Sequence, residues 1–95
     1  MNKVFMTGNL TRDPEVKQTQ GGKVRASFGI AVKRGTATDF FNVVAWEHNA
    51  EFISKYFSKG KRIIIEGYLK TNNYTDNKGI SHSGIDIIAD TVEFA

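Results

Sequence analysis

Three aromatic residues that stand near basic ones give the clearest chemical signal in this sequence: Phe40, Trp46 and Tyr74. Every nucleobase has a flat π-face, so exposed rings can bind a single strand without reading its sequence. Basic side chains in the same groove would contact phosphates, and binding would then weaken as the salt concentration rises. The basic residues that could line such a groove are Lys17, Arg25, Lys33, Arg34, Lys70 and Lys78.

A strand-like run from Asp39 to Trp46 carries two of these rings. Successive side chains of a strand point to opposite sides, so Phe41, Val43 and Ala45 can fill a core. We interpret the outward face as a base-stacking surface for single-stranded DNA. Because large aromatic residues are usually buried, a contact between subunits is the alternative. The outward residues are Phe40, Asn42, Val44 and Trp46.

Catalytic and metal-binding patterns are absent from the sequence. The two histidines, His48 and His82, and the acidic residues do not show the spacing of metal ligands or of paired catalytic groups. We therefore expect no catalytic residue, no metal and no cofactor, and interpret Asp86 and Asp90 as solvated residues of a half-exposed strand. Gly21-Gly22 predicts a hairpin turn, since the phosphate-loop pattern Gly-x-x-x-x-Gly-Lys-Ser/Thr is missing.

Length and composition narrow the class of protein. A chain of 95 residues, 40% of them hydrophobic, fits one globular domain over residues 1–95. No cysteine is present, which excludes disulfides and thiolate metal sites and favours the cytoplasm. No segment approaches the length of a signal peptide core or membrane helix, so no membrane partner is expected. The net charge of +3 indicates polyanion binding only where charges cluster.

Turn signals divide the chain into strands with one helix. Gly8 predicts a bend in the first strand, and the small residues Ser27, Gly29 and Ala31 predict space for a groove. The residues predicted to point inward from that third segment are Ala26, Phe28, Ile30 and Val32. The expected strands are 3–10, 15–19, 24–32, 39–46, 62–72 and 85–94.

Residues 49–59 predict the helix, with Ala50, Ile53 and Phe57 on one apolar face. Asn49 is a plausible N-cap, and Gly60 suits the left-handed position that follows a last turn. From these segments we expect the order three strands, one helix and two strands. That order predicts an all-β OB-fold, a five-stranded Greek-key barrel with the helix between strands three and four.

Two further features concern the last two strands. An outward row that is partly apolar indicates a subunit interface, with a ligand surface as the alternative. This row consists of Ile64, Glu66 and Tyr68. Residues 73–83 predict a polar loop in which Tyr74 is free to contact a bound strand; the alternative is a tyrosine folded back on its own hairpin.

The sequence resembles the bacterial-type single-stranded DNA-binding proteins, the SSB family. The matching segments follow the family's order and spacing over nearly the whole chain. They are Asn2-Lys3-Val4 through Gly8-Asn9-Leu10, Asp13-Pro14-Glu15-Val16, Phe40 to Trp46, Tyr56-Phe57-Ser58-Lys59-Gly60, Ile65-Glu66-Gly67 and Tyr74-Thr75-Asp76.

The resemblance implies a homo-oligomer, usually a tetramer with a dimer as the alternative, that wraps single-stranded DNA in replication, recombination and repair. It implies a cytoplasmic, nucleoid-associated protein without enzyme activity. The family's stacking positions fall on Phe40, Trp46 and Tyr74, where the family prefers Trp, Phe and Trp. Its basic contact positions match at Lys3, Lys17, Lys59 and Lys70.

Departures from the family pattern predict a weaker dependence on salt. Asn42, His48 and Asn72 stand where the family often has basic residues, and fewer phosphate contacts give a smaller salt slope. The loop of residues 33–39 is shorter than usual.

The family's Gly- and Pro-rich tail with an acidic tip does not follow Phe94-Ala95. Recruitment of replication and repair enzymes through such a tail is therefore not expected. The sequence is either trimmed or that of a short family member, and a short member would fit a phage, a mobile element or DNA uptake.

A competing hypothesis keeps the OB-fold but gives it another partner. The chain could act as a protein-interaction module, such as a primosome component, whose relatives stack bases more weakly. Binding of a protein partner more tightly than oligo-dT would distinguish that function from DNA binding.

Overall fold

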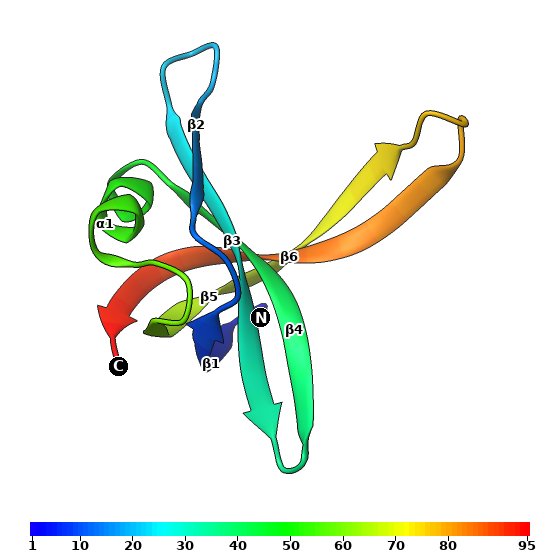
Figure 1. The fold of residues 1–95 in the computed structure, drawn as a ribbon. Helices are drawn as coiled ribbons and strands as arrows, with labels where there is room; N and C mark the ends of the chain where they lie inside the picture. The colour runs from blue at the N-terminus through cyan, green and yellow to red at the C-terminus, as the bar shows by residue number, and fades with distance from the viewer.

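Five strands close into a ring in the computed structural model, which describes residues 1–95 (Figure 1). The ring order is β1-β5-β6-β4-β3, and pairing of β1 with β3 closes it. Only β4 and β6 run parallel; the other neighbours are antiparallel. The elements are β1 Val4–Leu10, β2 Glu15–Gln18, β3 Val24–Arg34, β4 Ala37–Trp46, α1 His48–Tyr56, β5 Arg62–Thr75 and β6 Ser81–Phe94.

The predicted OB-fold is confirmed, with one correction to the strand count. β2 pairs only with β3 and lies outside the ring, so four strands precede the helix. The helix therefore lies between β4 and β5 rather than between strands three and four. Gly8 lies at the predicted corner, because β1 pairs with β5 up to Asn9 and with β3 at Asn9 and Leu10.

The core lies inside the ring and follows the period of two that the sequence shows. Phe28 and Ile30 of β3 and Val43 of β4 are fully buried, as predicted, whereas Val32 is only partly covered. Burial of each such side chain contributes about 1.5–3 kcal/mol. The eleven buried residues of this core are Leu10, Phe28, Ile30, Val43, Ala45, Ile53, Phe57, Ile63, Ile65, Ile87 and Ala89.

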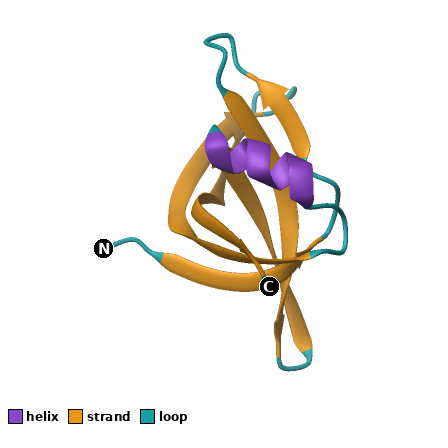
Figure 2. Cartoon of the chain, turned by 90° about the vertical axis from the view of Figure 1, so that its left-hand side faces the viewer, coloured by secondary structure: helices purple, strands orange, loops and turns teal.

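The helix α1 packs across the ring and contacts β2, β3, β4 and β6 (Figure 2). Ala50 and Ile53 are buried, as the apolar stripe predicts. Phe57 is 4% exposed but stands in extended backbone after the helix, where its ring still reaches the core. The helix spans nine residues. No helix here combines the length and apolar character that a bilayer-spanning helix needs.

Both predicted ends of the helix are wrong. Glu47, with φ 55°, occupies the N-cap position, and no side chain caps the helix. Asn49 instead donates hydrogen bonds to the carbonyl oxygens of Ala89 at 3.3 Å and Asp90 at 2.9 Å, which fastens α1 to β6. Gly60 has φ +89° as expected, but it shapes the turn into β5 instead of ending the helix.

The predicted polar loop of residues 73–83 is largely a continuation of the sheet. β5 and β6 stay paired out to Thr75 and Ser81, so Tyr74 lies on a strand opposite His82. This hairpin projects from the ring, in yellow and orange in Figure 1, and we call residues 70–86 the arm. β3 and β4 also continue past their predicted ends and join through Gly35 and Thr36.

Gly67 marks a β-bulge at which β5 comes very close to β6. A Cβ at this position would overlap the backbone carbonyl of Ile88. We therefore expect Gly67→Ala to lower the free energy of unfolding by at least about 2 kcal/mol, since backbone atoms must move to accept the methyl group. Urea denaturation of the two proteins measures this difference.

Gly84→Ala is the matched control for this variant. Gly84 also lies in the β5–β6 pairing, opposite Asn72, but a Cβ there would meet no atom within 4 Å. Its stability should stay equal to the parent or rise by up to about 1 kcal/mol. Equal urea midpoints for the two variants would contradict the close approach at Gly67.

Candidate nucleic-acid interface

A hollow of about 170 Å³ lies on the outer face of the ring where β3, β4, β5 and β6 meet. We call it the β4–β6 hollow. Five of its residues were predicted as site residues from the sequence, although they come from three separate strands. The lining residues are Arg25, Val44, Trp46, Lys70, Thr71, Asn72, Asp86 and Ile88.

Trp46 forms one wall of the hollow at the end of β4. Its side chain is 37% exposed, and Arg25 lies opposite it in the pairing of β3 with β4. The Arg25 guanidinium lies 5.9 Å from the centre of the indole ring, close enough for a cation–π contact. A flat ring and a fixed positive charge thus stand side by side at the rim.

Val44 does not have the exposure that the alternating pattern predicts. It is on the outer face, paired with Ser27 on one side and Ile88 on the other, but it is only 2% exposed. Neighbours on both strands cover it because β4 runs through the middle of the sheet. Val44 therefore forms part of the floor of the hollow.

A hydrogen-bonded row of polar side chains crosses the outer face. Asn42 Nδ2 donates to Asp86 Oδ1 at 2.9 Å, and Asn72 Nδ2 donates to Asp86 Oδ2 at 3.2 Å. The prediction that Asp86 is simply solvated is wrong, because its carboxylate joins β4 to β5. Its partners are distant in the sequence, which is why strand periodicity could not reveal them.

Arg12 is a member of this row that sequence reasoning missed. Its Nη2 donates to Asn42 Oδ1 at 3.2 Å. A Cβ at Gly29 would lie 2.5 Å from Thr11 Oγ1 and 3.1 Å from Arg12 Nη1, so the glycine leaves room for this approach. The space predicted from the small residues of β3 exists, and part of it is filled by Arg12. Gly29 is the one residue of the sequence that indicated this space for Arg12.

Phe40 stands apart from the hollow, towards the β3–β4 hairpin. Its ring is 71% exposed. Nearby, Arg34 donates from Nε to Asp39 Oδ2 at 3.0 Å, and this hydrogen bond lowers the pKa of Asp39 below its ordinary value. Lys33 lines a different depression, with residues of β1 and with Arg62.

Tyr74 and His82 stack across the two strands of the arm. Their ring centres are 5.0 Å apart and the ring planes differ by 18°. Tyr74 is still 57% exposed, so the stack covers only one side of its ring. The structure thus combines both interpretations of Tyr74, a ring packed on its own hairpin and a ring open to solvent.

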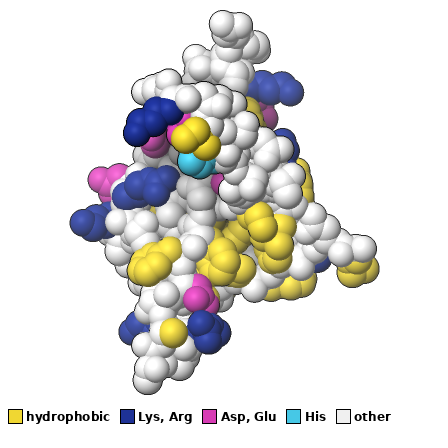
Figure 3. Space-filling model, turned by 90° about the vertical axis from the view of Figure 1, so that its right-hand side faces the viewer, with side chains coloured by type: hydrophobic (Ala, Val, Ile, Leu, Met, Phe, Trp, Pro, Cys, Tyr) yellow, Lys and Arg dark blue, Asp and Glu magenta, His cyan; other side chains and the backbone are white.

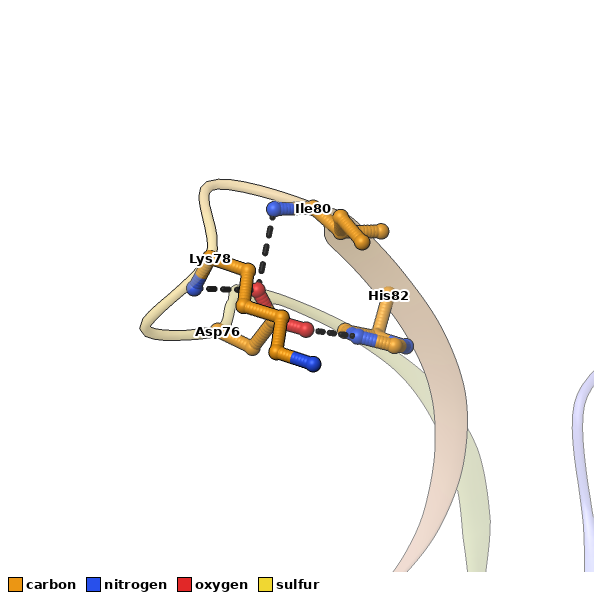
Figure 4. Close-up of polar contacts among 4 residues, drawn as sticks. All are labelled: Asp76, Lys78, Ile80 and His82. Carbon is orange, nitrogen blue, oxygen red and sulfur yellow. Dashed lines mark hydrogen bonds and ion pairs between the residues drawn. The ribbon is translucent and has the colours of Figure 1, made fainter.

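The turn of the arm is held by Asp76 (Figure 4). Asp76 Oδ1 accepts hydrogen bonds from the backbone N–H groups of Lys78 at 2.9 Å and Ile80 at 3.0 Å. Asp76 Oδ2 lies 2.8 Å from His82 Nε2, and an ionised carboxylate can only accept, so Nε2 is the donor. This one carboxylate fixes both the turn and the ring on which Tyr74 packs.

Several predicted contact residues do not line the hollow. Lys3 and Lys17 form ion pairs with Glu66 and Glu15, each at 3.0 Å. Lys59 donates its backbone N–H to Asp13. His48 is the first residue of α1 and lines a separate depression together with Glu51, Phe52, Lys55 and Tyr56.

The predicted interface row on β5 lies beside an exposed ring of β1. Ile64 and Glu66 line a shallow depression with Phe5, whose side chain is 73% exposed and was missed from the sequence. Tyr68 is 37% exposed. Figure 3 shows apolar side chains gathered across one side of the molecule, with basic side chains around them. No three His, Asp or Glu side chains come together as a metal site would require.

Comparison with known proteins gives a consistent family. The chain matches the single-strand binding protein family over residues 1–95. A single-stranded DNA-binding protein of Fusobacterium nucleatum is 42% identical over 99% of this chain and 66% of its own length. Single-stranded DNA-binding protein 1 of Staphylococcus aureus strain Mu50 is 37% identical over 99% and 65%. The chain spans just under two thirds of the length of these relatives.

The hydrogen bonds at Asp76 set a testable pKa. The bond from His82 has the largest effect and lowers the pKa of Asp76 below its ordinary 3.8; the N–H of Ile80 acts in the same direction. His82→Ala should therefore raise the pKa of Asp76 towards 3.8. Carbon-13 NMR of the carboxyl group during a pH titration measures it, and an unchanged pKa would contradict the contact. His48→Ala is the control and should leave the pKa of Asp76 unchanged.

The lowered pKa of Asp76 also determines how the stability of the arm changes with pH. Because the folded pKa of Asp76 is depressed, its ionised form stabilises the arm fully above pH 3.8. This contribution is lost as the pH falls through the lower, folded value. His82→Ala should reduce this acid sensitivity, which backbone amide chemical shifts of the arm would show in the same titration.

Proposed function

The chain belongs to the single-strand binding protein family, and from this premise we propose that it binds single-stranded DNA without sequence specificity. The binding surface is the outer face of the ring, from Phe40 across the β4–β6 hollow to the arm. Bases stack on Phe40, Trp46 and Tyr74. The protein serves in replication, recombination and repair as a cytoplasmic, nucleoid-associated binding protein, and it carries out no chemical step.

The observation that carries this proposal is the pairing of Trp46 with Arg25 at the rim of a hollow. Stacking of a base on an aromatic ring contributes about 1–3 kcal/mol, and the adjacent guanidinium can meet the phosphate of the same nucleotide. Phe40 is 71% exposed, and Tyr74 remains 57% exposed beside its contact with His82, whereas large aromatic side chains are more often buried. Rings that stay exposed at these positions are available to bases.

Rings should contribute more to affinity than charges do. Lys3, Lys17 and Arg34 form ion pairs with carboxylates of the same chain, and a phosphate would have to compete with them. Arg25 and Lys70 at the hollow make no ion pair and are the first candidates for phosphate contacts. A small number of neutralised phosphates gives a shallow dependence of binding on salt.

Trp46→Ala should weaken binding of oligo-dT by about 5- to 150-fold, the equivalent of losing 1–3 kcal/mol of base stacking. Phe40→Ala and Tyr74→Ala should each fall in the same range. Anisotropy of a labelled oligo-dT at one fixed salt concentration measures all four proteins. In the parent protein, saturating oligo-dT should also change the fluorescence of Trp46.

Tyr56→Ala provides an aromatic control on the helix. Tyr56 is 44% exposed and lies in the depression next to α1, apart from the β4–β6 hollow. Its removal should leave the affinity for oligo-dT unchanged. If Trp46→Ala binds as tightly as Tyr56→Ala, base stacking at the hollow is refuted. If the folded parent protein binds no oligo-dT, a protein-interaction module becomes the better interpretation.

We further propose that the chain assembles into a homotetramer or dimer through the face that carries Ile64, Glu66 and Tyr68. An exposed apolar patch of this kind commonly marks a contact surface, and Phe5 extends the patch onto β1. Light scattering should give two or four times the chain mass of 10.6 kDa. Tyr68→Asp should reduce the assembled mass, and a stable parent monomer at micromolar concentration would refute the assembly.

A further inference from the structure

The β4–β6 hollow contains a negative charge, which is unexpected on a face that binds DNA. Asp86 lines the hollow together with Trp46, Lys70 and Arg25. A phosphate would be repelled by the carboxylate, whereas the two basic side chains at the rim would attract it. This arrangement of charges would place the base of a bound nucleotide inside the hollow and its phosphate at the rim.

We propose that Asp86 reads the edge of a base held in this hollow, and that it favours bases with an exocyclic amino group, cytosine in particular, over uracil and thymine. This inference rests on the proposed function, since it requires single-stranded DNA on this face. It adds a base preference to a surface whose stacking rings alone would accept any base.

The carboxylate of Asp86 is held in a fixed orientation. Asn42 donates to one of its oxygens at 2.9 Å and Asn72 to the other at 3.2 Å. Arg12 donates to the amide oxygen of Asn42 at 3.2 Å, which leaves the amide nitrogen pointing at Asp86. Each carboxylate oxygen has a further lone pair, so both can still accept a hydrogen bond from a ligand.

A carboxylate can only accept hydrogen bonds, and this limits which base edge it can bind. The N4 amino group of cytosine is a donor and is a known partner of Asp and Glu side chains. Uracil and thymine carry a carbonyl oxygen at the same ring position, which a carboxylate repels. Trp46 can stack on the ring of a base while Asp86, in the same hollow, meets its edge.

Oligo-dC and oligo-dU of equal length separate this effect from stacking, since neither has a methyl group and the rings differ only at their edges. Anisotropy titrations at one salt concentration should show dC bound about fivefold more tightly than dU, the effect of one charge-assisted hydrogen bond. In Asp86→Asn the ratio of the two dissociation constants should fall to about 1. An unchanged ratio in that variant would overturn the proposal.

Asp90→Asn is the charge-matched control, because Asp90 is an exposed residue of the same strand and lies outside the hollow. It should keep the preference for dC. If Asp86→Asn tightens binding of both oligonucleotides equally, Asp86 acts only through its charge and the proposal is wrong. Failure of the parent protein to bind either oligonucleotide would instead refute the proposed function.

A measurement on the unaltered protein tests the proposal even if Asp86→Asn fails to fold. Oligonucleotides of 2-pyrimidinone have the cytosine ring without the N4 amino group. They should bind about as weakly as oligo-dU, since the donor to Asp86 is missing. Binding as tight as that of oligo-dC would overturn the proposal whether or not Asp86→Asn folds.

Discussion

The site depends on one strand pairing, the parallel contact between β4 and β6. This contact sets Asn42 opposite Asp86 and Val44 opposite Ile88. It also brings β5, which pairs with the other edge of β6, to the same face. Without it, β4 and β6 would be the two edge strands of an open sheet, and Trp46 and Asp86 would not line a common hollow. Closure of the ring therefore creates the proposed binding surface as well as the core.

The same face carries exposed aromatic rings at its ends and a hydrogen-bonded group of polar side chains at its centre. Phe40 and Tyr74 stand at its two ends and are mostly exposed. Between them lies a floor of Val44 and Ile88, bordered by a row of amides around one carboxylate. Stacking requires only a flat ring, whereas hydrogen bonding requires a fixed direction. The hydrogen-bonded centre and the exposed ends would suit these two proposed kinds of contact.

The core and the order of strands could be predicted because they depend on local pattern. Phe28, Ile30 and Val43 follow the period of a strand, and glycines mark the turns. The N-terminal end of the helix could not be predicted, because the Asn49 side chain binds carbonyl oxygens of β6 that are distant in the sequence, and it does not cap the helix. The burial of Val44 and the contacts of Arg12 depend on strands far away in the sequence.

The amides in this face have a physical consequence for the kind of binding that it supports. A basic residue at Asn42 or Asn72 would form an ion pair with Asp86 and cancel its charge. The amides hold the carboxylate by hydrogen bonds and leave that charge in place. An oriented, unneutralised acceptor discriminates between base edges more strongly than a neutralised one. On the proposed binding face, the neutral residues would therefore reduce attraction for phosphates and, at the same time, keep Asp86 able to distinguish bases.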